Sequence, residues 1–211
     1  MLAFPEVQVR APAELDEVVG RARAPTFADL PSLPYIRAMA KEVLRWSPPL
    51  PFGVSHASSA DDWYDGMFIP KGTIILPNMR VINSDPAVFG SDSARFNPAR
   101  YLDEKGQVKV LMDGHDEGHV SFGHGRRQCP GRFSAEGTLG IDFATLLWAL
   151  RFERPEGGQG ELDVHTLVHI GIGAYVFLLL RPWVRTNLHV SVAPGLSSAT
   201  RSLGSRTLKV Y

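Results

Sequence analysis

The frequency of proline and glycine is the feature that most limits what this chain can fold into. Its 211 residues include 16 prolines and 20 glycines. Both residue types interrupt regular backbone, because proline lacks an amide donor and glycine readily adopts turn conformations. We therefore expect helices linked by long irregular segments. Hydrophobic residues (44%) and charged residues (21%) occur in ordinary globular proportions, which argues against a wholly disordered chain or a polytopic membrane protein.

The charge balance and the cysteine content exclude several classes of function. Twenty-two basic and 22 acidic residues give a formal net charge of zero, so nothing indicates a nucleic-acid partner. The single cysteine, Cys129, excludes an intramolecular disulfide and a multi-cysteine zinc or iron–sulfur site. The apolar start of the chain is too short for a signal peptide. The apolar stretch Leu167–Leu180 is shorter than a membrane span, so we interpret it as a buried segment.

Helical periodicity marks three segments. Pro5–Gly20 begins with a residue suited to a first helical turn and ends with one suited to a helix stop, and Pro12 is expected to kink or split it. Tyr35–Trp46 has an apolar stripe at helical spacing and ends before two prolines. Arg132–Leu150 has a second apolar face of the same kind.

Between the second and third helices the pattern changes. Turn dipeptides such as Asp65-Gly66 lie among short apolar runs, which predicts Met67–Ile69 and Thr73–Leu76 as small strands of a hairpin or meander. A short helix is predicted around Ala87–Phe89. Residues Gly90–Ser121 show no sustained period, and a loop of this length in a compact domain is usually functional or wrapped on something.

The most informative chemical feature is the segment Phe122–Gly131. Cys129 precedes a predicted helix start, where free amides and the positive helix end favour a thiolate. Three arginines add positive charge: Arg126, Arg127 and Arg132. Three glycines let the backbone approach something large and flat: Gly123, Gly125 and Gly131. A thiolate offers one soft metal ligand, so the other ligands must come from a cofactor, and the four ring nitrogens of haem meet that need.

By residue type alone, a lone cysteine is most often a small buried residue. The surrounding pattern opposes that alternative, because Phe-x-x-Gly-x-Arg-x-Cys-x-Gly sets five residues at defined offsets. It resembles the cysteine loop of the cytochrome P-450 (haem-thiolate monooxygenase) family. The resemblance implies that Cys129 is the axial iron ligand and that Arg127 pairs with a haem propionate. It also implies that Phe122 packs beside the sulfur and that Gly125 belongs to the haem-binding loop.

Two weaker motifs follow the order that the family has. Glu42 and Arg45 form a Glu-x-x-Arg on the Tyr35–Trp46 helix, and Arg100 lies in the later segment Phe96–Tyr101. Taken alone, an i,i+3 ion pair is a commonplace solvated feature. The resemblance implies that these three residues form a buried charge triad that holds the long loop under the haem. Removal of one partner should then cost about 3–5 kcal/mol, because a buried charge is left unpaired.

Other polar residues keep two interpretations. His56 lies where the family often binds a propionate, and the alternative is an exposed loop histidine. Arg80 faces either a propionate or solvent. Three further histidines near Cys129 are interpreted as solvated loop residues rather than as a separate metal site: His115, His119 and His124. The metalloprotease and dinucleotide-binding motifs are both incomplete.

The resemblance extends over residues 1–157 and corresponds to the carboxy-terminal part of the family domain. It implies a mainly α fold with small β elements. We interpret residues 158–211 as a divergent, poorly ordered tail and the chain as a fragment. In the family, a long distal helix carries an acid and a threonine that deliver protons to bound oxygen. No stretch of this sequence resembles that helix, so no catalytic residue is assigned.

The resemblance implies a function as well. Family members are monooxygenases that contain haem b (iron protoporphyrin IX) and insert one oxygen atom from O2 into a small organic substrate. Electrons come from an NADPH–cytochrome reductase, for which Arg126 and Arg132 are either a docking face or plain surface. The endoplasmic reticulum membrane is implied as the location, and Asp61–Thr73 is similar to fungal members in secondary metabolism. The alternative is a non-catalytic haem-binding remnant with an exposed apolar surface.

Overall fold

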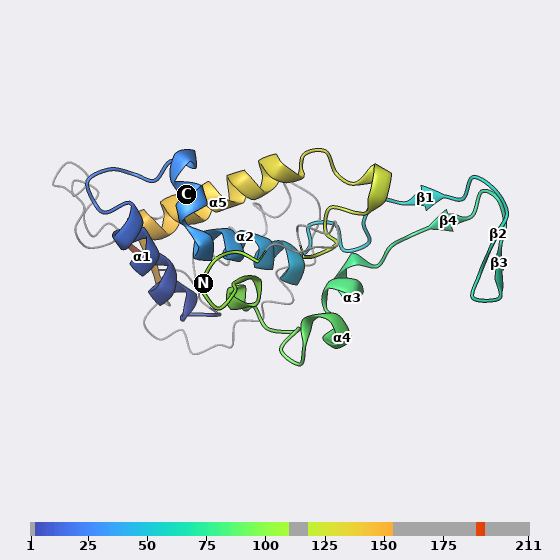
Figure 1. The fold of residues 1–211 in the computed structure, drawn as a ribbon, viewed down its shortest axis with the longest axis horizontal. Coiled ribbons are helices and arrows are strands. Elements are labelled where there is room, and N and C mark those ends of the chain that lie inside the picture. The colour runs from blue at the N-terminus through green and yellow to red at the C-terminus, as the bar shows by residue number, and fades with distance from the viewer. Residues whose placement is uncertain (1–2, 110–117, 154–188, 193–211) are drawn as a thin grey trace.

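The computed structural model describes residues 3–109, 118–153 and 189–192. Its body consists of three helices, α1 (Val7–Val18), α2 (Pro34–Trp46) and α5 (Arg132–Ala149). Figure 1 shows α5 running alongside α2, with α1 at one end of the pair. The other helical elements are short: the 3-10 turns η1 (Phe27–Ser32), η2 (Pro98–Tyr101) and η3 (Gly125–Arg127), and the helices α3 (Met79–Asn83) and α4 (Pro86–Phe89).

The hydrophobic core lies where the three long helices meet. α2 is the central helix, and most of its residues are buried. α1 contributes Val7, Ala11 and Leu15, which are spaced four residues apart and so share one face. α5 contributes Ala144 and Leu147 to the same core. This arrangement confirms the predicted fold class, which was mainly α with small β elements.

The helix α1 runs unbroken through Pro12, so of the predicted kink or split, the split does not occur. A proline inside a helix costs about 3 kcal/mol, because it removes one backbone hydrogen bond and crowds the preceding turn. Contacts outside the helix offset that cost, since α1 buries its apolar stripe. Its Gln8 side chain also clamps the backbone of Phe152, donating to the carbonyl at 2.9 Å and accepting from the amide at 2.8 Å.

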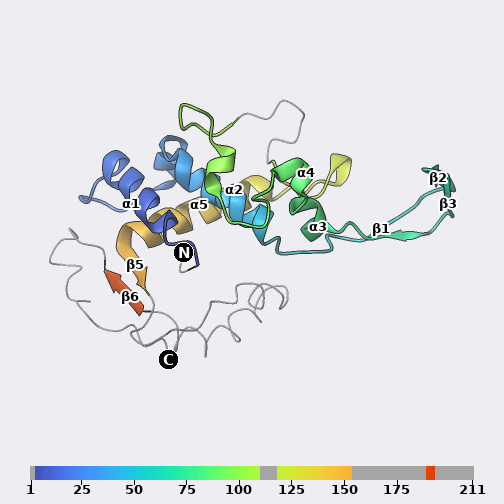
Figure 2. The ribbon, with the colours of Figure 1, turned by 90° about the horizontal axis from the view of Figure 1, so that it is seen from below.

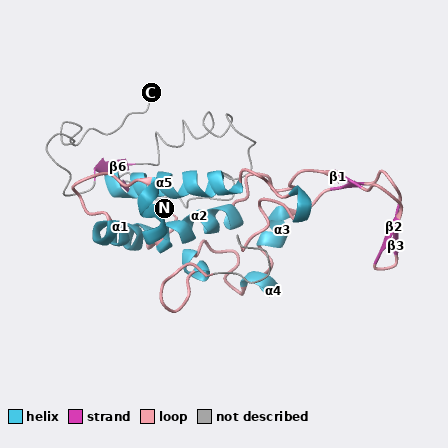
Figure 3. Ribbon diagram, turned by 45° about the horizontal axis from the view of Figure 1, so that its top comes forward, coloured by secondary structure: helices cyan, strands magenta, loops and turns pink. Residues whose placement is uncertain are grey.

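Three two-stranded antiparallel sheets complete the fold. β1 (His56–Ala57) pairs with β4 (Ile74–Ile75), and β2 (Asp62–Tyr64) pairs with β3 (Met67–Ile69). These four strands form an arm that projects from the helical body (Figures 1 and 3). β5 (Leu150–Glu153) continues from α5 and pairs with β6 (His189–Val192), as Figure 2 shows.

The arm contains both strands predicted for a hairpin or meander, and each pairs with a strand that was not predicted. Met67–Ile69 is a strand as predicted, but it pairs with β2 rather than with β4. The reversal occurs at Asp65 and Gly66, whose φ angles of 49° and 75° are both left-handed and suit a tight hairpin turn. The arm also exposes many large apolar side chains: Trp63, Tyr64, Met67, Phe68, Ile74, Ile75 and Leu76.

The remaining sequence predictions have mixed outcomes. The helices predicted at Tyr35–Trp46, Ala87–Phe89 and Arg132–Leu150 are confirmed within one residue at each end. The stretch Leu167–Leu180 lies outside the described residues, as does most of 158–211, of which only β6 is described. Among the helices that the structure describes, none combines the length and apolar character needed to cross a membrane.

Candidate functional site

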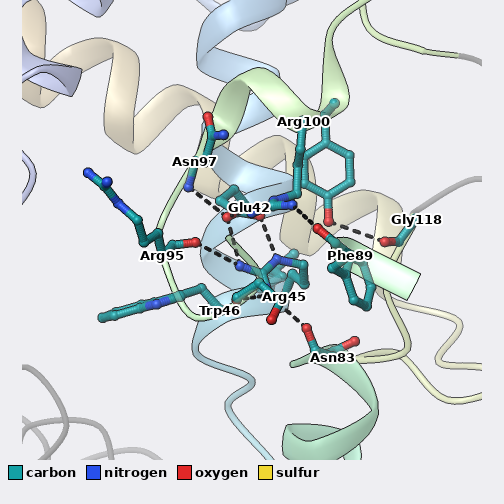
Figure 4. Close-up of polar contacts among 12 residues, drawn as sticks. Glu42, Arg45, Trp46, Asn83, Phe89, Arg95, Asn97, Arg100 and Gly118 are labelled. Carbon is teal, nitrogen blue, oxygen red and sulfur yellow. Dashed lines mark hydrogen bonds and ion pairs between the residues drawn. The ribbon is translucent and has the colours of Figure 1, made fainter. Parts of the chain in front are cut away.

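A buried charge cluster sits at the carboxyl end of α2. The side chains of Glu42 and Arg45 are both fully buried. Arg45 donates from Nε to Glu42 Oε2 at 2.7 Å and from Nη2 to Glu42 Oε1 at 2.8 Å, which is a two-point fork (Figure 4). Arg100 Nε donates to the same Oε1 at 3.1 Å, and the Asn97 amide donates to it at 2.7 Å. Every contact of the buried carboxylate is therefore with a donor.

The two arginines of this cluster also organise the irregular segment that follows α3. Their guanidinium groups donate to five backbone carbonyls at 2.7–3.1 Å: those of Asn83, Phe89, Asp92, Ser93 and Arg95. The Asp92 carbonyl also accepts from the Arg95 amide at 2.8 Å, whereas the other four belong to the last residues of α3 and α4 or to irregular backbone, where buried carbonyls left unpaired are costly. The rigid fork of arginine replaces the missing donors. The structure thus joins Glu42, Arg45 and Arg100 in one cluster.

The segment around Cys129 is a closed loop in front of α5. The Cys129 amide donates to the Phe122 carbonyl at 2.8 Å, and the Gly123 amide donates to the Val120 carbonyl at 2.9 Å. Gly123 and Gly125 have φ angles of 78° and 56°, in the left-handed region that favours glycine. A Cβ at either glycine would meet no atom within 4 Å. The glycines therefore serve the backbone path, and the space beside the loop is open.

Cys129 is exposed, so the alternative of a small buried cysteine is wrong. A Cβ built at Gly131 would lie 3.8 Å from Cys129 Sγ, which places this glycine directly beside the sulfur. Arg126 and Arg127 are exposed on the same loop. Within the described part of the chain, no three His, Cys, Asp or Glu residues gather in a way that could hold a metal ion. One exposed soft ligand on an open, glycine-lined loop with cationic neighbours fits a haem.

His119 corrects the prediction of solvated loop histidines. It is buried, its Nδ1 accepts from the Ser121 amide at 3.3 Å, and its ring lies 5.5 Å from the Phe122 ring. Burial lowers the pKa of His119 to about 3, and the charges of Lys41 and Arg45 act in the same direction. His119 is therefore neutral near pH 7. Of the other two histidines, His124 is exposed as predicted, and His115 lies outside the described residues.

Comparison with known proteins decides the family. The family model for cytochrome P450 matches residues 1–175 of this chain. The chain belongs to the cytochrome P450 family. It is 49% identical to a cytochrome P450 monooxygenase of Armillaria gallica over 82% of this chain and 34% of that protein. It is 49% identical to cytochrome P450 monooxygenase 58 of Postia placenta over 76% of this chain and 30% of that protein.

A further relative is the cytochrome P450 monooxygenase iboC of Amanita muscaria, 41% identical over 71% of this chain and 35% of that protein. The resemblance predicted from the cysteine loop, including its fungal character, is confirmed. The P450 chain spans about a third of the length of these curated relatives. Haem is the cofactor that membership of this family implies.

The two other residues predicted to face a haem propionate, His56 and Arg80, lie outside the cysteine loop. His56 is exposed on β1, where it is the register partner of Ile75 on the arm. Arg80 is partly buried in α3, and its amide donates to the Pro51 carbonyl at 3.1 Å. No contact described for either residue reaches the cysteine loop. Their roles toward a propionate stay predictions.

Sequence reasoning missed one polar residue of the site. Asn83, at the end of α3, is fully buried and hydrogen-bonds to the two residues before Phe122. An asparagine before Ser-Asp-Pro looks like an ordinary loop residue in the sequence. Only its partners, which lie far along the chain, show that it belongs to the site.

Proposed function

We propose that this protein is a haem-thiolate monooxygenase in which Cys129 is the axial ligand of the haem iron. The observation that supports this most directly is the exposed thiol of Cys129 on the closed, glycine-lined loop of a P450 chain. The names of the fungal relatives, all cytochrome P450 monooxygenases, support the same reaction class.

The other residues have supporting roles in this proposal. Arg127 and His56 bind the haem propionates, and Phe122 packs beside the sulfur. Gly125 permits the loop path, because its φ of 56° would strain most other residues. The cluster of Glu42, Arg45 and Arg100 fixes the irregular segment beside the haem-binding loop. Residues 1–157 form the haem-binding part, and 158–211 are the divergent segment, of which the family model still matches residues 158–175.

Haem b, when bound, supplies the activation of O2, and a thiolate ligand favours cleavage of the O–O bond. The chain itself contributes the thiolate, the loop that aims it and the charges around it. Arg126 and Arg132 face an acidic patch on an NADPH-dependent reductase, which delivers the electrons. The substrate is a small organic molecule of fungal secondary metabolism, and the protein works at the endoplasmic reticulum membrane.

Reconstitution with haemin tests the proposal. The wild-type chain, loaded with haemin, reduced with dithionite and exposed to carbon monoxide, is expected to show the red-shifted absorption band of a thiolate-ligated haem. The variant Cys129→Ser should lose this band, because serine is a poor ligand in place of a thiolate. The variant His124→Ala, which changes another exposed residue of the same loop, should keep it. A wild-type spectrum without the band refutes the proposal.

A second candidate is haem binding without turnover. The exposed apolar side chains of the arm favour it, because patches of that kind normally mark a surface that another chain segment or partner covers. Product formation with a reductase, NADPH and a small organic substrate separates the two candidates. A chain that shows the thiolate band but forms no product supports the second.

A further inference from the structure

We propose that Asn83 is a positioning residue that holds the cysteine loop in the geometry needed to present Cys129 to haem. This inference rests on the proposed function, because it concerns the same haem ligand. Asn83 is fully buried, with a relative exposure of 0%. It lies at the end of α3, on an element separate from the loop it would position.

Both ends of the Asn83 amide bind the residues that lead into the loop. Asn83 Oδ1 accepts from the Val120 amide at 2.9 Å, and Nδ2 donates to Ser121 Oγ at 2.8 Å. Ser121 Oγ in turn donates to the Leu44 carbonyl at 2.6 Å. The direction of every bond is determined, because the Val120 amide can only donate and the serine proton is already used on a carbonyl.

These bonds reach Cys129 through a short path. The Gly123 amide donates to the Val120 carbonyl, and the Cys129 amide donates to the Phe122 carbonyl at 2.8 Å. The Asn83 side chain binds Val120 and Ser121, the two residues that precede Phe122. It therefore fixes the backbone just before the Phe122 carbonyl, which accepts the hydrogen bond from the Cys129 amide. Residues that hydrogen-bond a metal ligand directly typically change metal affinity or activity by about 10–100-fold when mutated, and Asn83, which acts through Val120 and Ser121, is expected at the lower end of that range.

Asn83 also connects the loop to the buried charge cluster. Its backbone carbonyl accepts from Arg45 Nη1 at 2.7 Å, while its side chain holds the segment before Phe122. One residue therefore joins the cluster around Glu42 to the cysteine loop. A purely structural residue would stabilise the fold without any particular effect at Cys129, and this difference can be measured.

The variant Asn83→Asp tests the inference at nearly constant volume. It replaces the donor facing Ser121 with an acceptor, and so breaks one bond of the clamp. The matched control is Gln8→Glu, because Gln8 makes the same two-bond amide clamp on Phe152 between α1 and β5. The milder variant Ser121→Ala removes the hydroxyl and keeps the bond from Val120, so it carries the test if Asn83→Asp does not fold.

Two readouts are needed. In the haem-free chain, amide hydrogen exchange measured by NMR should accelerate at Cys129 in Asn83→Asp and in Ser121→Ala, because both variants release the side chain of Ser121 from Asn83, but not in Gln8→Glu. In the haemin-loaded chain, haemin affinity should fall by about 10-fold or more in Asn83→Asp and much less in Gln8→Glu. Equal exchange at Cys129, or equal haemin affinity, in Asn83→Asp and Gln8→Glu overturns the inference. Absence of the thiolate band in the wild type refutes the proposed function instead. In that case the hydrogen-exchange measurement alone decides whether Asn83 positions the cysteine loop.

Discussion

The variant Arg45→Lys should destabilise the protein strongly although it keeps the positive charge. Arg45 makes two hydrogen bonds to Glu42 and three to backbone carbonyls, and its side chain is fully buried. A lysine ammonium has only three donors on a flexible stem. At least two buried acceptors would lose their partner, and each such loss costs about 1–3 kcal/mol. We expect a loss of about 2–6 kcal/mol, a range that includes the cost of breaking a buried ion pair.

Urea unfolding of the haem-free chain, followed by circular dichroism, measures this loss as a lower midpoint at an unchanged slope. The matched control is Arg151→Met, which breaks an ion pair of similar length, 3.1 Å to Glu153, on an exposed surface. The control should change stability by no more than about 0.5 kcal/mol. If Arg45→Lys is within about 1 kcal/mol of the wild type, the fork of hydrogen bonds is not what holds this region, and the reasoning fails.

Two further predictions concern the neighbourhood of Cys129. The pKa of His119 is about 3 in the fold, below the ordinary 6.5. Between these two values the unfolded chain binds a proton at His119 that the folded chain does not. The free energy of unfolding therefore falls as the pH is lowered from 6.5 towards 3. Between pH 7 and pH 5 we expect the free energy of unfolding, measured with urea, to fall by about 2 kcal/mol. The variant His119→Gln should largely abolish this fall. An unchanged pH dependence in that variant would show that His119 is not its source. Gly125→Ala should destabilise the haem-free chain by about 1–2 kcal/mol, because φ is 56° there. Gly131→Ala, where the added Cβ makes an ordinary contact, should cost less, and equal costs would argue against backbone strain at Gly125.

Local patterns were sufficient to predict the long helices and the cysteine loop. α2 and α5 follow from apolar residues at helical spacing, and their ends lie within a residue of the prediction. Cys129 follows from five residues at set offsets within a ten-residue segment. Short-range information of this kind is present in any contiguous stretch, so it can be interpreted before the chain folds. Pro12 does not split α1, because the packing of this helix outweighs the local tendency of proline to interrupt helices.

The tertiary structure alone decided which polar residues are buried and which strands pair. Asn83 bonds to Val120 and Ser121, 37 and 38 positions away, and Ser121 bonds to Leu44, 77 positions away. His119 is buried as well, and the charges that act on it, those of Lys41 and Arg45, lie more than 70 positions away. Burial and hydrogen-bond partners depend on segments that are distant in the sequence, and no local period records them. The amino-acid sequence thus determined the helices and the cysteine loop, whereas the fold decided what holds that loop in place.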